Sequence, residues 1–449
     1  MDPIHFDRLL TPAGWRNDVT VEIAEGRIAA LAPGRRPGAA SHRIGLPGLP
    51  NLHSHAFQRG MAGLAETRGP GPDSFWSWRD TMYRFALAMT PDDVEAVAGQ
   101  LYVEMLEAGF TRVGEFHYLH HAPDGRPYGD VAEMATRIAA AAGTAGIGLT
   151  LLPVFYARAG FDGAPASAGQ RRFCCDLDGY AGLVSGCERA IAGLAGADLG
   201  LAPHSLRAAT PEELLAVAGM AGGRPVHIHV AEQVAEVEDC VARRGARPVA
   251  WLLDHAPVDE RWCLIHATHM EDAESAGLAA RGATVGLCPV TEANLGDGIF
   301  DAPRFLGAGG RFGVGTDSNV SVDAGGELRQ LEYSQRLARR ARNVLAAPGA
   351  STGAALFEAA LAGGAAALGQ GSVGIAMGAP ADFVSLAADH PALAGHGTAS
   401  ALDAWIFAGG AALVDGVWTR GFQQVAGGRH RHRDAVRRRF AATMARLAG

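Results

Sequence analysis

The feature that most restricts the fold is a regular alternation of short apolar runs and helix-like segments between residues 49 and 316. Each run has the length of one strand, and each gap has room for a helix. Two of the helices carry start signals, since Thr90 and Thr210 both stand before a proline and two acidic residues. This alternation predicts a (β/α)8 (TIM) barrel. We expect its strands to end near His53, His117, Phe155, His204, Val230, His266, Cys288 and Thr316.

Both ends of the chain have the pattern of β-structure. Near the N-terminus, apolar residues alternate with polar ones up to a turn at Glu25-Gly26. Towards the C-terminus, apolar segments return at 381–386, 405–407 and 414–418, and we read the last two as a hairpin around Asp415-Gly416. The prediction is a small β-sandwich built from both termini, residues 1–47 and 371–425. It would flank a barrel at 48–370 and precede a helical tail at 426–449.

The composition excludes several kinds of chemistry and partner. The chain of 449 residues contains no lysine, because all 39 basic residues are arginines. A Schiff-base lysine and a carbamylated lysine bridging two metals are therefore impossible, and a metal site should be mononuclear. The net charge of −8 argues against nucleic acid and anionic membranes as partners.

The sequence also predicts a cytoplasmic protein. No apolar run reaches the ~18 residues of a membrane span, and the N-terminus does not resemble a signal peptide. The six cysteines have neither the spacing of a zinc finger nor that of a disulfide framework, so reduced thiols are the simplest reading.

Histidines at predicted strand ends suggest a metal site. His53 and His55 are two residues apart, so in a strand they face the same side and can bind one ion. Barrel enzymes build their active sites at these C-terminal strand ends. The pair alone can be accidental, since the chain has 17 histidines. Asp317, after the eighth strand, is a candidate oxygen ligand and second proton acceptor, although it could also be a helix cap.

The fifth and sixth strands add further candidates. His227 and His229 both face inward by strand parity, and spacing alone leaves the choice of ligand open. We favour His229, because Glu232 follows three residues later and could take a proton from an attacking water. The alternative for Glu232 is a carboxylate at a helix N-terminus, favoured by the helix dipole. His266 would either bind the metal or hydrogen-bond the water. Together these residues suggest a hydrolytic zinc centre.

Longer motifs make the prediction more specific. The order HxH, His-x-x-Glu, His, Asp resembles the amidohydrolase superfamily, in its branch of mononuclear zinc deaminases. Four segments resemble the formimidoylglutamate deiminase family: residues 50–63 (PNLHSHAFQRGMAG), 75–79 (FWSWR), 288–298 (CPVTEANLGDG) and 327–333 (ELRQLEY). The segment at 319–326 is less typical. The resemblance implies one Zn²⁺ per chain on His53, His55, His229 and Asp317, Glu232 as proton shuttle, and His266 as the group that orients water and stabilises charge.

The resemblance also implies a substrate and a reaction. N-formimidoyl-L-glutamate would be hydrolysed to N-formyl-L-glutamate and ammonia, a step of histidine degradation. A substrate with two carboxylates calls for arginines. The candidates are Arg207, after the fourth strand, and Arg79, in an aromatic segment at 75–83 that we expect to be a loop over the barrel mouth. The resemblance adds polar contacts from Gln58, Tyr118 and His204.

Two alternatives fit the same residues. One is a zinc deaminase or chlorohydrolase that acts on a purine, pyrimidine or triazine. The other is an inactive scaffold, which is disfavoured because every ligand position and Glu232 carry capable groups. A homodimer is implied by the resemblance alone.

Overall fold

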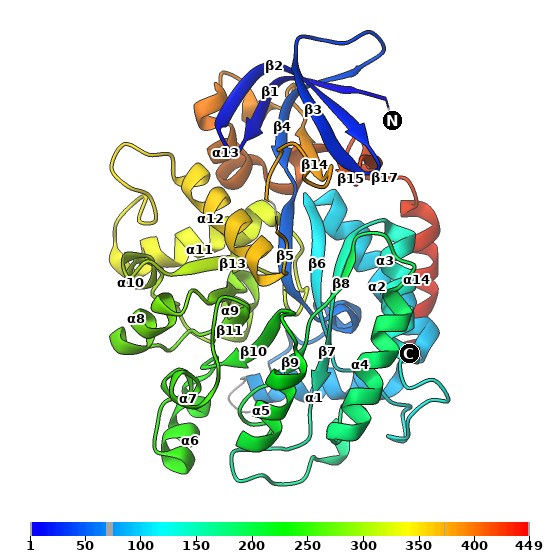
Figure 1. The fold of residues 1–449 in the computed structure, drawn as a ribbon, viewed down its shortest axis with the longest axis vertical. Helices are drawn as coiled ribbons and strands as arrows, with labels where there is room; N and C mark the ends of the chain where they lie inside the picture. Colours follow the sequence, from blue (N-terminus) through cyan, green and yellow to red (C-terminus); the bar gives the residue numbers. More distant parts are fainter. Residues whose placement is uncertain (1, 69–74, 372, 448–449) are drawn as a thin grey trace.

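The predicted barrel is confirmed in the computed structural model, which describes residues 2–68, 75–371 and 373–447 (Figure 1). The predicted segments 1–47, 371–425 and 426–449 include residues 1, 372 and 448–449, which lie outside the described part. The side chains of Phe75, Trp76 and Thr398 lie outside it too. The barrel strands are β5 (Leu49–Ser54), β6 (Phe110–His117), β7 (Gly148–Phe155), β8 (Ala197–Leu199) continued by β9 (Ala202–Pro203), β10 (Val226–Val230), β11 (Trp262–His266), β12 (Thr284–Leu287) and β13 (Arg311–Val314).

Single bridges close the ring of strands. The strands pair in parallel as β5-β6-β7-β8, with β9 on β7, and as β10-β11-β12-β13. A bridge between Ser54 and Asp317 joins the first strand to the chain just after the last, and a bridge between Ser205 and His229 joins the two sheets on the other side. Both bridges involve residues at the C-terminal strand ends, so the closure also brings the predicted site residues together.

Five of the barrel strands, β5, β6, β10, β11 and β12, are buried along their whole length. Helices cover their outer side and side chains fill the inside, which explains the continuous apolar runs. The surrounding helices are α2 (Pro91–Glu107), α3 (Glu133–Ala145), α4 (Leu177–Ile191), α5 (Pro211–Met220), α6 (Val234–Arg244), α7 (Pro248–His255), α8 (Asp272–Ala280), α9 (Pro289–Leu295), α10 (Ala302–Gly307), α11 (Ala324–Arg339) and α12 (Thr352–Ala367).

The two predicted helix starts are confirmed. Thr90 caps α2: its side chain accepts from the N–H of Asp93, and the Asp93 carboxylate accepts from the N–H of Thr90. Thr210 and Glu213 make the same reciprocal pair at α5. These capping boxes satisfy N–H groups that the first helical turn leaves without partners.

Both termini contribute to one sheet, as predicted. Its order is β17-β16-β15-β14-β4-β1-β2-β3, and Figure 1 shows it at the end of the barrel where β5 begins. The predicted turn at Glu25-Gly26 joins β2 to β3, with φ angles of 51° and 76°. The strands are β1 (Ile4–Thr11), β2 (Gly14–Ala24), β3 (Arg27–Pro33), β4 (Ala40–Pro47), β14 (Phe383–Leu386), β15 (Val414–Thr419), β16 (Phe422–Ala426) and β17 (Arg429–His430).

The hairpin predicted around Asp415-Gly416 is wrong. Gly416 lies inside β15, where a Cβ would come within 2.6 Å of the Trp418 ring, so the glycine serves close packing. The turn is at Arg420-Gly421, whose φ angles of 48° and 78° suit a two-residue hairpin. Residues 405–407 are also not a strand. They continue α13 (Ala401–Ala404) as a helical turn that buries Trp405, because a short apolar run fits a helix as well as a strand.

The C-terminal tail contains β17 and then α14 (Arg433–Leu447). This helix lies along α2, where Arg446 pairs with Asp93 and Arg439 with Glu95. The arginine-rich tail is thus partly engaged in ion pairs with the barrel. Within the described residues, no helix combines the length and the apolar character that crossing a membrane requires.

The aromatic segment predicted as a loop is a helix, α1 (Phe75–Ala88). The segment has neither glycine nor proline to interrupt a helix, and Met82, Phe85 and Ala86 are buried. Arg79 and Tyr83 are one turn apart, and the guanidinium lies 5.5 Å from the ring centre. Side chains of α1 do line the cavity at the barrel mouth, so its expected place was right although its conformation was not.

Candidate active site

Three imidazoles and one carboxylate converge where β5, β10 and β13 end. Asp317 Oδ1 lies 3.2 Å from His55 Nε2 and 3.4 Å from His53 Nε2. His229 Nε2 lies 3.1 Å from His53 Nε2. All four side chains are buried, and their potential ligand atoms lie within 4.8 Å of one another. The structure therefore brings together the four residues predicted to bind the metal.

The hydrogen bonds of this cluster suit a metal ion. His55 Nδ1 lies 2.9 Å from the Phe116 carbonyl oxygen, and His229 Nδ1 lies 3.1 Å from that of His204. A carbonyl only accepts, so each Nδ1 carries the hydrogen and each Nε2 presents a lone pair to the cluster. Burial lowers the pKa of His53 to about 3, which keeps that ring neutral. Neutral imidazoles and a carboxylate are the donor set of a divalent transition-metal ion.

The structure separates His229 from His227. His227 Nε2 lies 2.8 Å from the carbonyl oxygen of Ala367, at the end of α12. Its ring is therefore engaged away from the cluster, whereas His229 is part of it.

Asn319 holds the strand ends in place. Its side-chain amide donates to the carbonyl oxygens of His55 (3.1 Å) and Asp317 (2.8 Å), and its oxygen accepts from Thr316 Oγ1. Asp317 and Asn319 have φ angles of 45° and 58°, a conformation that costs energy in residues other than glycine. The unusual segment at 319–326 therefore begins with a residue that fixes the carboxylate. None of the described residues 319–326 lines the cavity beside the metal cluster.

His266 lies beside the cluster and faces Glu232. Its Nε2 is 3.7 Å from Glu232 Oε1 and 3.9 Å from Asp317 Oδ2, and its Nδ1 is 3.2 Å from Glu292 Oε1. Burial lowers the pKa of His266, but the surrounding carboxylates outweigh burial and raise it to about 10. Burial raises the pKa of Glu232. A cationic imidazole next to a buried carboxylate can orient water and stabilise developing negative charge.

A second carboxylate, Glu236 on α6, organises the turn that carries Glu232. It accepts from the N–H groups of Ala231 and Glu232, both at 3.1 Å. Arg207 Nη2 lies between the two carboxylates, 3.9 Å from Glu236 and 4.0 Å from Glu232. Arg207 Nε is buried and has no acceptor among the described residues. This guanidinium therefore has a donor left for a ligand.

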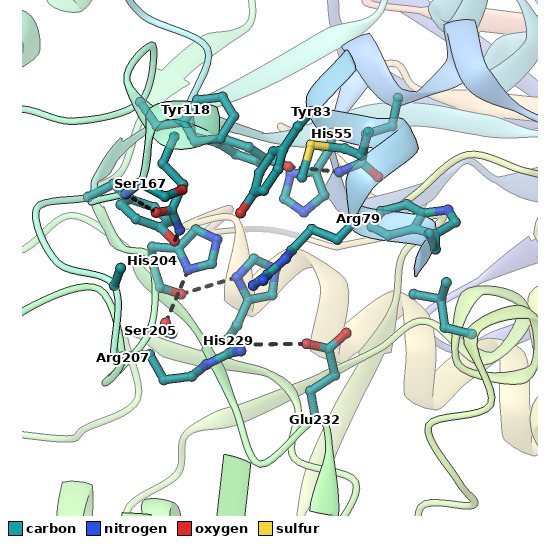
Figure 2. Close-up of a pocket in the computed structure, with 18 of the residues that line it drawn as sticks. His55, Arg79, Tyr83, Tyr118, Ser167, His204, Ser205, Arg207, His229 and Glu232 are labelled. Atoms are coloured by element: carbon teal, nitrogen blue, oxygen red, sulfur yellow. Dashed lines mark hydrogen bonds and ion pairs between the residues drawn. The ribbon is translucent and has the colours of Figure 1, made fainter. Parts of the chain in front are cut away.

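The predicted substrate residues meet around one cavity of about 310 Å³. Figure 2 shows Arg79, His204, Arg207 and Glu232 directed at a common space next to His55 and His229. Gln58 donates to the hydroxyl of Tyr118 at 2.8 Å on another wall. Each of the five predicted substrate contacts lines this cavity, as do Glu232, His266 and Asp317.

Family models match almost the whole chain. The model of the amidohydrolase family matches residues 44–422, which include the barrel and every residue of the cluster.

The chain belongs to the amidohydrolase family.

Residues 1–45 of this amidohydrolase match the model of the N-terminal domain of formimidoylglutamate deiminase HutF. A formimidoylglutamate deiminase from Pseudomonas aeruginosa is 50% identical, with 100% of each chain covered. A solved amidohydrolase structure from Brucella melitensis is 58% identical, with a TM-score of 0.97 and 100% of both chains covered. An adenosine deaminase structure from Xanthomonas campestris with bound zinc has a TM-score of 0.84 over 99% of this chain and 98% of that one. It is only 24% identical, so it supports the fold alone.

Three residues that organise the site of this amidohydrolase were not predicted: Glu236, Glu292 and Asn319. Glu292 lies in the quoted segment 288–298, and its position in a family motif could have pointed to it. Glu236 is four residues after Glu232, in the first turn of α6, where an acidic side chain can accept from the N–H groups that precede the helix. Asn319 acts through contacts with Ser54, the last residue of β5, and with His55, which is 264 residues away, so no local pattern reveals it.

Proposed function

We propose that this amidohydrolase hydrolyses N-formimidoyl-L-glutamate to N-formyl-L-glutamate and ammonia. The observation that carries the proposal is the presence of two arginines, Arg79 and Arg207, in the cavity that also contains the metal cluster and Glu232. The substrate has two carboxylates, and guanidinium groups recognise carboxylates in a bidentate manner. The similarity to a curated formimidoylglutamate deiminase along the whole chain supports the same substrate.

We assign the metal as one Zn²⁺ per chain, held by His53, His55, His229 and Asp317. When bound, zinc supplies Lewis-acid activation that lowers the pKa of water from 15.7 to ~7. No lysine is available to bridge a second ion.

The chain's own residues move the protons and hold the substrate. Glu232 takes a proton from the attacking water as its oxygen bonds to the formimino carbon. The same carboxyl gives this proton to the formimino nitrogen. It then transfers the second water proton, from the new hydroxyl, to the same nitrogen, so that a C=O bond forms as the C–N bond breaks and ammonia leaves. His266 donates through Nε2 toward the charge that develops on oxygen, with Glu292 fixing its other nitrogen. Asp317 is a second possible acceptor for the water proton.

The arginines orient the substrate. Arg207, with Nε unpaired among the described residues, binds one carboxylate, and Arg79 on α1 binds the other. Gln58, Tyr118 and His204 contribute polar contacts. Two fixed points at the ends of a flexible diacid position the formimino carbon beside Glu232.

The proposal includes a setting for the enzyme. The reaction would be a step of histidine degradation in the cytoplasm, which agrees with the six free cysteines. A homodimer remains a prediction, to be checked by light scattering.

Ammonia release tests the function. Formimidoylglutamate should be turned over with a kcat/KM well above that of formimidoylaspartate, formiminoglycine and guanine. Guanine or another uncharged heterocycle as the preferred substrate would overturn the proposal in favour of a nucleobase or triazine hydrolase.

A further inference from the structure

Tyr156 is a buried residue of the cavity that none of the steps above uses. It directly follows β7, and because Phe155 pairs with Pro203 of β9, it stands next to His204. The ring centres of Tyr156 and His204 are 4.6 Å apart.

Backbone hydrogen bonds join the loop after Tyr156 to the segment that carries Arg207. The N–H of Gly160 donates to the carbonyl oxygen of Arg207, and the N–H of Ala157 donates to that of Ala208, both at 2.8 Å. Tyr156 and Arg207 are thereby held on two linked walls of the same cavity.

The hydrogen bonds around Gln170 show which group donates in its contact with the Tyr156 hydroxyl. The N–H of Ser167 donates to Gln170 Oε1 at 2.7 Å, which identifies that atom as the oxygen of the amide. Gln170 Nε2 therefore donates to the Tyr156 hydroxyl oxygen, at 2.6 Å. Since this oxygen accepts from Gln170, the Tyr156 hydrogen is not engaged with Gln170 and can be donated to another group.

Tyr118 lacks such a constraint. Its hydroxyl also meets a glutamine amide, that of Gln58, but Gln58 Oε1 is buried without a partner among the described residues. The orientation of that amide is therefore not fixed by a backbone donor. Of these two phenols, Tyr156 is the one whose hydrogen is left available by a fixed glutamine amide.

We propose that Tyr156 is a specificity-determining residue that donates its hydroxyl hydrogen to the substrate carboxylate bound by Arg207. This inference rests on the proposed function. Burial keeps the phenol protonated by raising its pKa, so it remains a donor over the working pH range. A carboxylate that accepts hydrogen bonds from both Arg207 and the Tyr156 O–H has more of its lone pairs paired than one bound by Arg207 alone. An uncharged substituent at that place would leave both donors unpaired.

Tyr156→Phe removes the donor and keeps the ring. We expect KM for formimidoylglutamate to rise roughly ten-fold or more, with kcat nearly unchanged, because a lost hydrogen bond to a charged group has about this effect. The inhibition constant of the product N-formyl-L-glutamate should rise by a similar factor.

Tyr180→Phe is the matched control. Tyr180 is also a buried tyrosine next to β7, but its hydroxyl donates to the carbonyl oxygen of Pro153, and it does not line the cavity. This variant should keep the wild-type KM even if its melting temperature falls, which separates loss of a ligand contact from damage to the fold.

Two substrate analogues locate the contact. One is 4-(formimidoylamino)butyrate, which lacks the α-carboxylate, and the other is 2-(formimidoylamino)pentanoate, which lacks the side-chain carboxylate. If Arg207→Met leaves kcat/KM for one analogue unchanged, Tyr156→Phe should leave kcat/KM for the same analogue unchanged. An unchanged KM for formimidoylglutamate in Tyr156→Phe, or an equal loss with both analogues, would overturn the role of Tyr156 alone. A wild-type enzyme inactive on formimidoylglutamate would instead refute the proposed function and this inference with it.

Discussion

Replacing Arg207 by methionine tests the recognition of a dianionic substrate. The guanidinium lies 3.9 Å from Glu236 and 4.0 Å from Glu232, and its Nε has no acceptor among the described residues. A charge-assisted hydrogen bond is worth ~1.5–3 kcal/mol. At ~1.36 kcal/mol per factor of ten, kcat/KM for formimidoylglutamate should fall roughly ten- to 150-fold.

The substitution also affects the proton shuttle. The charge of Arg207 lowers the pKa of Glu232, against the larger effect of burial, which raises it. Its removal should therefore raise the pKa of Glu232 further, and the variant should lose additional activity as the pH falls. The substrate contact is best isolated on the alkaline side of this transition, where Glu232 is ionised in both proteins.

The assay compares kcat/KM of wild type and variant with formimidoylglutamate and with the two analogues that lack one carboxylate. For the analogue that lacks the carboxylate bound by Arg207, kcat/KM should fall far less in Arg207→Met than it does for formimidoylglutamate. Arg158→Met is the control, since Arg158 pairs with Glu213 outside the cavity. If Arg207→Met behaved like this control on every substrate, the reasoning that assigns a carboxylate to Arg207 would be refuted.

Three further predictions follow from the site. Glu232→Gln should keep the metal and lower kcat by ~10²–10⁴. Near-normal turnover would show that Asp317 or His266 transfers the proton instead. Elemental analysis should find about one zinc per active chain, since no lysine can bridge two ions; two tightly bound metals would contradict this. In wild type, kcat/KM should fall as the pH drops through the pKa of Glu232, which burial raises above 4.5; an acid limb well below pH 4.5 would exclude Glu232 as the base.

The barrel and the metal cluster could be predicted because their signals are local. Most barrel strands are buried on both sides, so their sequences are short apolar runs, and the active-site residues follow directly at strand ends. The order of the strands was enough to predict that His53, His55 and Asp317 lie close together. Spacing could not decide between His227 and His229, since both face inward. The choice depended on the Ala367 carbonyl, which a helix far along the chain supplies.

Other features depended on contacts between distant segments, or on a local signal that was overlooked. Gly416 looks like a turn residue, but it is required by the ring of Trp418. The apolar residues 405–407 fit a strand or a helix equally well, because so short a run does not show which of its side chains are buried. The aromatic segment around Arg79 has no breaker, and its helix could have been predicted from that absence. The role of Asn319 follows from hydrogen bonds to a segment that it meets only in the fold, whereas Glu236 bonds to neighbouring residues and could have been found from its spacing.

The identity of the bond that breaks tests the central claim most directly. Attack of water on the formimino carbon can expel ammonia, which gives N-formylglutamate, or the substrate amine, which gives glutamate and formamide. Turnover in H₂¹⁸O, followed by mass spectrometry, distinguishes the two. If Glu232 protonates the terminal nitrogen, the product is N-formylglutamate with one ¹⁸O in its formyl group, and one ammonia is released per turnover. Free glutamate with labelled formamide, or no conversion of formimidoylglutamate, would contradict the account.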